Sequence, residues 1–180
     1  MTETMQIVLG EITGVLEQVK PQELTTVVGC IRKDCRIFVS GEGRSGFMAK
    51  GFAMRLMHLG YSAFVIGETV TPAIASGDVL VAVSGSGESA YVLTDAKKAR
   101  EKGCTVVAVT SKAKSALTQL SDEVLIVPGT VRGDSGEARG SVQLLSSLFD
   151  QSVHIILDVL CLMLSARDNT SNQEATQKHW

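Results

Sequence analysis

Two segments rich in serine and glycine contain most of the residues that could bind a small anion. The clearer segment follows the apolar run 79–83, whose composition is typical of a strand buried on both faces of a parallel sheet. A helical pattern begins directly after it, at about residue 89. Glycines let a ligand approach the backbone, the start of a helix favours negative charge, and hydroxyls add neutral donors. The segment predicts a phosphate-monoester site formed by Ser84, Gly85, Ser86, Gly87, Glu88 and Ser89.

The same pattern, S-G-x-G-x-S, occurs a second time at residues 40–45, again after an apolar run. A tight turn with a serine N-cap is the alternative explanation for either segment alone. Two such loops in one small sheet favour a ligand site over turn chemistry. Arg44 in the first loop is then expected either to help hold the phosphate or to pair with an acid, with a surface charge as the alternative.

The first loop also matches a dinucleotide-binding fingerprint. Gly41, Gly43 and Gly46 have the G-x-G-x-x-G spacing between a strand and a helix, and Glu68 could act as the ribose-binding acid. The fingerprint does not call for a second, serine-bearing loop on the neighbouring unit. A chain of 180 residues also leaves little room for a separate substrate domain. Dinucleotide binding is therefore the weaker hypothesis.

Helical and strand patterns alternate along the chain and predict a single α/β domain. Such an alternation gives right-handed crossovers and a parallel sheet, and ligands bind at the carboxyl ends of its strands. We expect a doubly wound, three-layer sandwich with a five-stranded sheet. Its parts are N-terminal helices over 1–34, a sheet core over 35–128 that includes both loops, a long helix over 141–167 and a polar, mobile tail over 168–180, with a loop at 128–140 before the long helix.

Composition excludes several classes of function. The formal net charge is −2 and no basic run occurs, which argues against nucleic-acid binding. The N-terminus lacks the features of a signal peptide, and the apolar block 153–164 is interrupted and too short to cross a bilayer. The four cysteines lack the spacing of a disulfide framework or a metal site, so we expect reduced thiols, a cytoplasmic location and no membrane association.

Beyond these patterns, the chain resembles the SIS (sugar isomerase) domain family over nearly its whole length, and within it the 6-phospho-3-hexuloisomerases of the ribulose monophosphate pathway. The residues that carry the resemblance are 41–46, 52–60, 67–69 with 71–72, and 84–89. The resemblance implies a homodimer or homotetramer with sites near subunit contacts. It implies that the second serine loop holds the substrate phosphate and that Gly43 and Ser45 lie against the substrate. It also implies a catalytic acid at the start of the last helix, where this chain has Asp150 in place of the family's glutamate.

The implied reaction interconverts a 3-ketose and a 2-ketose through an enediol across C2 and C3. The reaction needs a base, hydrogen-bond donors for the developing oxyanion and groups that bind the phosphate, but no metal or redox cofactor. Asp150 is the first candidate for the base, with support of the helix start as its alternative role. His58 could act in ring opening or reach a neighbouring subunit's site, and Glu68 could be an acid/base or a hydroxyl ligand; a structural histidine and a solvated charge are the alternatives. A non-catalytic sugar-phosphate sensor and an SIS isomerase for another sugar phosphate remain the competing functions.

Overall fold

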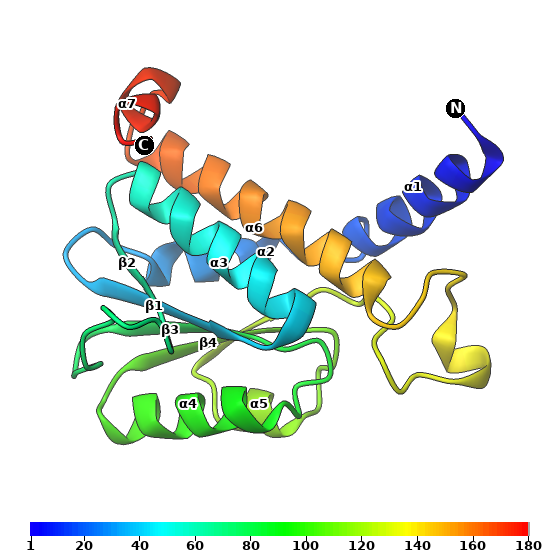
Figure 1. Ribbon diagram of the computed structural model, residues 1–180, viewed down its shortest axis with the longest axis horizontal. Coiled ribbons are helices and arrows are strands. Elements are labelled where there is room, and N and C mark those ends of the chain that lie inside the picture. The colour runs from blue at the N-terminus through cyan, green and yellow to red at the C-terminus, as the bar shows by residue number, and fades with distance from the viewer. Residues whose placement is uncertain (180) are drawn as a thin grey trace.

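The computed structural model describes the backbone of residues 1–179 and their side chains except those of Glu137 and Ala138; Trp180, the end of the expected tail, lies outside the described residues. Three layers are visible in Figure 1, with the sheet between two sets of helices. The elements in chain order are α1 (Glu3–Leu16), α2 (Pro21–Cys30), β1 (Arg36–Gly41), α3 (Gly43–His58), β2 (Ser62–Val65), β3 (Val79–Val83), α4 (Ala90–Glu101), β4 (Thr105–Thr110), α5 (Ala116–Gln119), β5 (Glu123–Ile126), the 3₁₀ helix η1 (Gly136–Arg139), α6 (Ser147–Arg167) and α7 (Asn172–Gln177).

The sheet has five parallel strands in the order β2-β1-β3-β4-β5. The chain leaves β1 toward one edge and returns to β3 on its other side, so the strand order reverses between these two strands. In doubly wound sheets this reversal leaves a crevice at the carboxyl ends of the two central strands. Both serine–glycine loops follow these strands, β1 and β3. The predicted fold class is confirmed.

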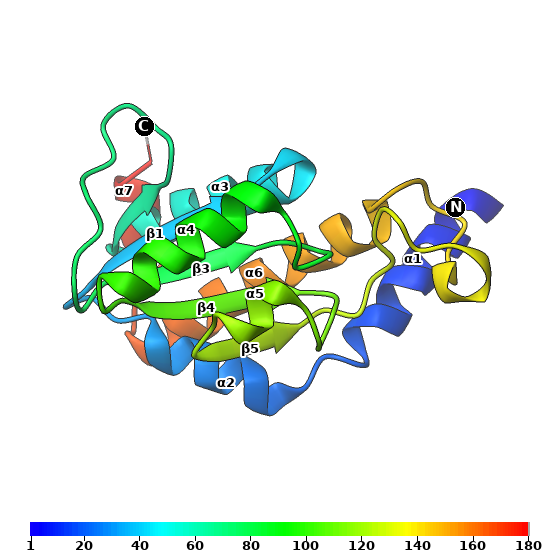
Figure 2. The same ribbon diagram turned by 90° about the horizontal axis from the view of Figure 1, so that it is seen from below.

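The residues of β3 explain why the sheet is covered on both faces. All five are buried, and alternate side chains enter different cores because successive residues of a strand point to opposite faces. Val81 belongs to the core formed with α1, α2, α3 and α6, while Leu80 belongs to the core formed with α4 and α5. Figure 2 shows α4 and α5 across one face of the sheet, with α6 and α2 on the other. The four cysteines are free thiols.

The long helix α6 begins at Ser147, six residues later than the expected start at 141. The preceding segment is irregular because Leu145 has a φ of 53°, in the left-handed region that a helix excludes. Glu11 of α1 holds this segment by accepting hydrogen bonds from the Ser141 hydroxyl and the Val142 N–H, each at 2.8 Å. Figures 1 and 2 both show α1 beside this part of the chain.

By length and composition, α6 could cross a membrane. More than half of its most apolar stretch is buried inside the protein, including Phe149, Leu157 and Leu164, which belong to the core shared with α3. A core helix passes the same test of length and composition, so α6 is weak evidence for a membrane span.

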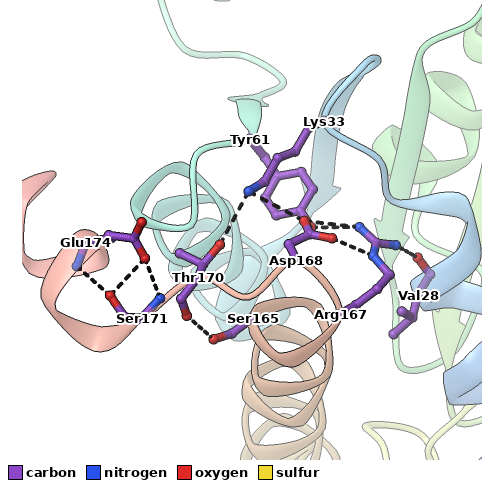
Figure 3. A network of polar contacts seen from close by, with 9 residues as sticks. All are labelled: Val28, Lys33, Tyr61, Ser165, Arg167, Asp168, Thr170, Ser171 and Glu174. Carbon is purple, nitrogen blue, oxygen red and sulfur yellow. Dashed lines mark hydrogen bonds and ion pairs between the residues drawn. The ribbon is translucent and has the colours of Figure 1, made fainter.

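The end of the chain contains a capped helix where we expected a polar, mobile tail. Ser171 and Glu174 form a reciprocal capping box at the start of α7. Before it, Asp168 accepts hydrogen bonds from the Tyr61 hydroxyl and the Arg167 guanidinium and lies 3.6 Å from Lys33 Nζ (Figure 3). These contacts join the end of α6 to the region that precedes β1 and β2, and they hold α7 over the end of α3.

Candidate functional site

A cleft of about 700 Å³ lies at the carboxyl ends of β1 and β3. Residues from both serine–glycine loops line it, together with two residues of the loop after β5 and residues around the start of α6. The lining residues are Glu42, Gly43, Arg44, Ser45, Gly85, Ser86, Glu88, Ser89, Val131, Arg132, Leu145, Ser146 and Asp150. The structure thus brings together most of the predicted binding residues and the first candidate base.

The loop after β3, residues 84–89, is compact because two glycines allow close approach. A Cβ on Gly85 would lie 2.7 Å from Val131 Cγ1, and one on Gly87, whose φ is 69°, would lie 2.2 Å from Ser115 Oγ. The Ser84 hydroxyl is buried and accepts the Gly87 N–H at 3.1 Å. The loop therefore presents backbone and hydroxyl groups to the cleft, with Glu88 as its one large side chain there.

Ser89 bears on the choice between the turn and the site interpretations of this loop. It occupies the N-cap position of α4, yet its side chain makes no capping hydrogen bond. Its Oγ instead lies 3.0 Å from Ser84 Oγ. The first N–H groups of a helix have no partner within the helix, so α4 offers uncapped donors and a favourable dipole at the edge of the cleft. This arrangement suits an anion better than a simple capped turn.

Glu88 in the same loop has a structural contact. Its carboxylate accepts the Ala116 N–H at 2.8 Å, which joins the loop to the start of α5. The side chain is exposed and lines the cleft. Its predicted part in substrate binding remains a prediction.

The first loop brings β1 close to the start of α3. A Cβ on Gly46 would lie 2.6 Å from the Gly41 carbonyl oxygen, and Gly43 begins the helix with a φ of 56°. Only glycine accommodates both features without strain. The close approach places Ser45 in the first turn of α3, directed at α6.

Asp150 in the first turn of α6 receives contacts from this loop. Ser45 Oγ donates a hydrogen bond of 2.7 Å to Asp150 Oδ1, and Arg44 Nε lies 3.8 Å from Asp150 Oδ2. Arg44 Nη1 also donates to Ser147 Oγ at 2.6 Å, which fixes the guanidinium over the start of α6. The three residues 44, 45 and 150 therefore form a connected group at one wall of the cleft.

Burial controls the electrostatics of this group. Asp150 is 2% exposed, and burial raises the pKa of its carboxyl group because the charged form loses hydration. The Ser45 hydrogen bond and the Arg44 charge favour the carboxylate and lower the pKa, but they offset burial only in part. Asp150 is consequently a stronger base than an exposed aspartate while still lining the cleft.

Glu68 and His58 do not join this group within one chain. Glu68 pairs with Lys50 at 2.6 Å and lines a separate cavity of about 260 Å³ beside Asp95 and Lys98. His58 ends α3, thirteen residues after Ser45 and therefore roughly 20 Å along the helix.

His58 is buried and stacks on His179, with ring centroids 5.2 Å apart. Burial lowers the pKa of His58, with a further contribution from the charge of Arg55. A role for His58 in the site of a neighbouring subunit remains a prediction.

Several residues of the site were not predicted from the sequence, among them Glu42 and Ser146, which line the cleft. Ser147 holds Arg44, while Val131, Arg132 and Leu145 line the cleft from the irregular segment between β5 and α6. In the sequence, only their position just before the helix that carries Asp150 could have indicated that these residues belong to the site. Among the side chains described by the structure, which leave out Glu137, no three histidine, cysteine, aspartate or glutamate residues gather as metal ligands would.

Comparison with known proteins agrees with this geometry. A family model described as the SIS domain matches residues 30–157. The chain belongs to the SIS domain family. The resemblance expected from the two loops is thereby confirmed, and it extends beyond the matched residues into both ends of the chain.

The chain is also similar to proteins of about the same length and to a solved structure. An uncharacterized protein of Archaeoglobus fulgidus is 37% identical, and the match covers 99% of this chain and 98% of that protein. The 3-hexulose-6-phosphate isomerase of Bacillus subtilis is 32% identical over 99% of this chain and 96% of its own length. A crystal structure from Methanococcus jannaschii, described as inferring a molecular function of 3-hexulose-6-phosphate isomerase, has a TM-score of 0.84 at 28% identity. It covers 99% of this chain and 98% of its own.

Proposed function

We propose that this SIS-family chain interconverts a 3-hexulose 6-phosphate and fructose 6-phosphate. Relatives of similar length carry the name of that activity. The observation that carries the proposal is the buried carboxylate of Asp150, bonded to Ser45 and lining the same cleft as the loop after β3. A phosphate site alone would serve a binding module, whereas a base with a raised pKa beside it suits proton transfer at carbon.

The phosphate group binds at the loop formed by residues 84–89. Ser86 and Ser89 are half-buried and line the cleft, and the uncapped N–H groups of α4 add donors and a positive dipole end. Binding the phosphate fixes the sugar at a distance from the reacting carbons, so that remote binding energy orients the reacting end.

Asp150 transfers the proton. Starting from the 3-ketose, its carboxylate removes the hydrogen bound to C2, and the electron pair of that bond forms the C2–C3 double bond as the C3 oxygen becomes an enolate. The C3 oxygen takes a proton from water, which gives the enediol. The C2 hydroxyl then releases its proton to water while Asp150 returns its proton to C3, which yields the 2-ketose. The proton taken from water is given back to it, so the atoms balance without an oxidant or reductant.

Arg44 and Ser45 stabilise the charges that form along this path. The Arg44 guanidinium, held by Ser147, lies beside the carboxylate and adds positive charge where the enolate develops. Ser45 orients the carboxylate by donating to Oδ1, so that Oδ2 is the oxygen available to the substrate.

Two further predictions extend this function. The reaction would be the isomerisation step of formaldehyde fixation by the ribulose monophosphate pathway, in the cytoplasm. A homodimer or homotetramer would allow His58 of one protomer to reach the cleft of another. The pathway and the oligomer come from the family resemblance.

Deuterium exchange tests the proposed reaction. Fructose 6-phosphate is incubated with the protein in D₂O and followed by proton NMR. We expect deuterium at C3 together with a new 3-ketose signal. Exchange at C1 would instead mean aldose–ketose chemistry, and binding without exchange at either carbon would make the protein a sugar-phosphate sensor.

A further inference from the structure

The loop between β5 and η1 adds a cation to the cleft that the reaction scheme above does not use. Arg132 lines the cleft and is exposed. Its neighbour Val131 packs against Gly85, whose added Cβ would lie 2.7 Å from Val131 Cγ1. Arg132 therefore starts one residue away from the phosphate-binding loop, on the wall formed by that loop.

The backbone that carries Arg132 is fixed from three directions. The Arg132 N–H donates to Ser146 Oγ at 3.1 Å, and the Val131 N–H donates to Asp134 Oδ2 at 3.0 Å. Lys112 Nζ lies 2.7 Å from Asp134 Oδ1 and ties the turn to the end of β4. The fixed backbone keeps the Cα of Arg132 beside the loop after β3, so that only the side chain has to become ordered around a ligand.

The side chain of Arg132 is also uncommitted. Among the side chains that the structure describes, its guanidinium makes no hydrogen bond or ion pair, whereas the other arginine of the cleft, Arg44, is held by Ser147 and Asp150. The two arginines thus have different partners on different walls. Arg44 stands over the reacting group, and Arg132 stands beside the anion loop.

We propose that Arg132 is the positive ligand of the substrate's phosphate group. This inference rests on the proposed function, because it assigns the phosphate to the loop of residues 84–89. The hydroxyls and N–H groups of that loop are neutral, so Arg132 supplies the charge that distinguishes a phosphate dianion from an uncharged sugar. Its planar guanidinium can donate two parallel hydrogen bonds to phosphate oxygens.

Equilibrium binding tests the assignment without requiring turnover. The variants are Arg132→Met, Arg132→Lys and, as a control with the same change of charge, Arg100→Met on the exposed face of α4. Thermal unfolding first establishes that each variant folds. Titration calorimetry then measures the dissociation constants of fructose 6-phosphate, inorganic phosphate and fructose at low and high salt.

We expect Arg132→Met to weaken binding of fructose 6-phosphate and of phosphate by about tenfold at low salt, as the loss of one exposed, charge-assisted hydrogen-bonding partner would. Added salt should shrink the difference because Arg132 is exposed. Arg132→Lys should recover most of the affinity, and Arg100→Met should bind as the unaltered protein does. In the exchange assay the loss should appear in KM rather than in kcat.

Unchanged affinity of Arg132→Met for fructose 6-phosphate would overturn the inference. So would an equal loss for fructose, since that would place Arg132 on the sugar, or a loss in kcat alone. If the unaltered protein binds fructose 6-phosphate but shows no exchange at C3, and Arg132→Met still weakens binding, the proposed reaction fails and the assignment of Arg132 stands.

Discussion

Replacing Asp150 with asparagine tests the core of the proposed mechanism. The change removes the base but keeps an oxygen at Oδ1 that can accept the Ser45 hydrogen bond, now 2.7 Å long. A positioned general base contributes roughly 10²- to 10⁴-fold to a rate, which corresponds to about 3 to 5 kcal/mol of activation free energy. We expect C3 exchange in Asp150→Asn to fall by a factor in this range, with binding of fructose 6-phosphate retained.

Although Asp150→Asn should lose activity, it should not lose stability at neutral pH. Burial raises the pKa of Asp150 in the folded protein, so the folded state holds its proton more tightly than the unfolded chain. The stability of the unaltered protein therefore falls as the pH rises from the ordinary aspartate pKa through the raised one. Asp150→Asn escapes this loss, and above that window it should resist urea at least as well as the unaltered protein.

The pH profile supplies a second measurement. Because the carboxylate is the active form, exchange at C3 should decline as the pH falls through the raised pKa of Asp150. This acid limb should lie above the pKa of about 4 of a free aspartate. Asp158→Asn is the matched control, since Asp158 is an exposed acid on the same helix and does not line the cleft. Exchange in folded Asp150→Asn within threefold of the unaltered rate would refute the assignment of the base.

Three other substitutions, one of them paired with a control substitution, test the site and the structure around it. Ser45→Ala removes a hydrogen bond that lowers the pKa of Asp150, so the acid limb of C3 exchange should move to higher pH; an unmoved limb would contradict the contact. Gly85→Ala places a Cβ 2.7 Å from a neighbouring side chain and should lower the free energy of unfolding, measured by urea denaturation, by about 1 to 3 kcal/mol. Its control, Gly14→Ala, places a Cβ with nothing within 4 Å and should raise that free energy by about 0.5 to 1 kcal/mol. Equal effects of the two substitutions would be inconsistent with close packing at the loop. Asp168→Asn removes a carboxylate whose pKa is held at about 2, chiefly by Arg167. The substitution should lower the free energy of unfolding by about 2 kcal/mol above pH 4, and this loss should disappear as the pH falls to about 2. The same loss at high and at low pH in urea denaturation would argue against the ion pair.

Much of the fold and part of the site could be predicted from the amino-acid sequence. The apolar run 79–83 and the loops at 40–45 and 84–89 predicted parallel strands with an anion site at their carboxyl ends, because strand burial and glycine conformation are local properties. The start of α6 was misplaced, since Leu145 has a helix-compatible side chain and only its left-handed backbone ends the regular structure. The helix α7 was missed because five of its six residues are polar, and its formation depends on a capping box and on contacts with α3.

Assembly of the site was decided only by tertiary structure. The sequence named Ser45 and Asp150 separately, 105 positions apart, and could not state that their side chains meet at 2.7 Å. The sequence also could not separate Glu68 from these two residues, because Glu68 follows a strand of the same sheet. In the structure the cleft lies where the strand order reverses between β1 and β3, whereas Glu68 pairs with Lys50 and lines another cavity. Arg132 became visible only when Val131 was seen to pack on Gly85. Local residue types determined which chemistry was available, and long-range packing determined which groups share one cleft.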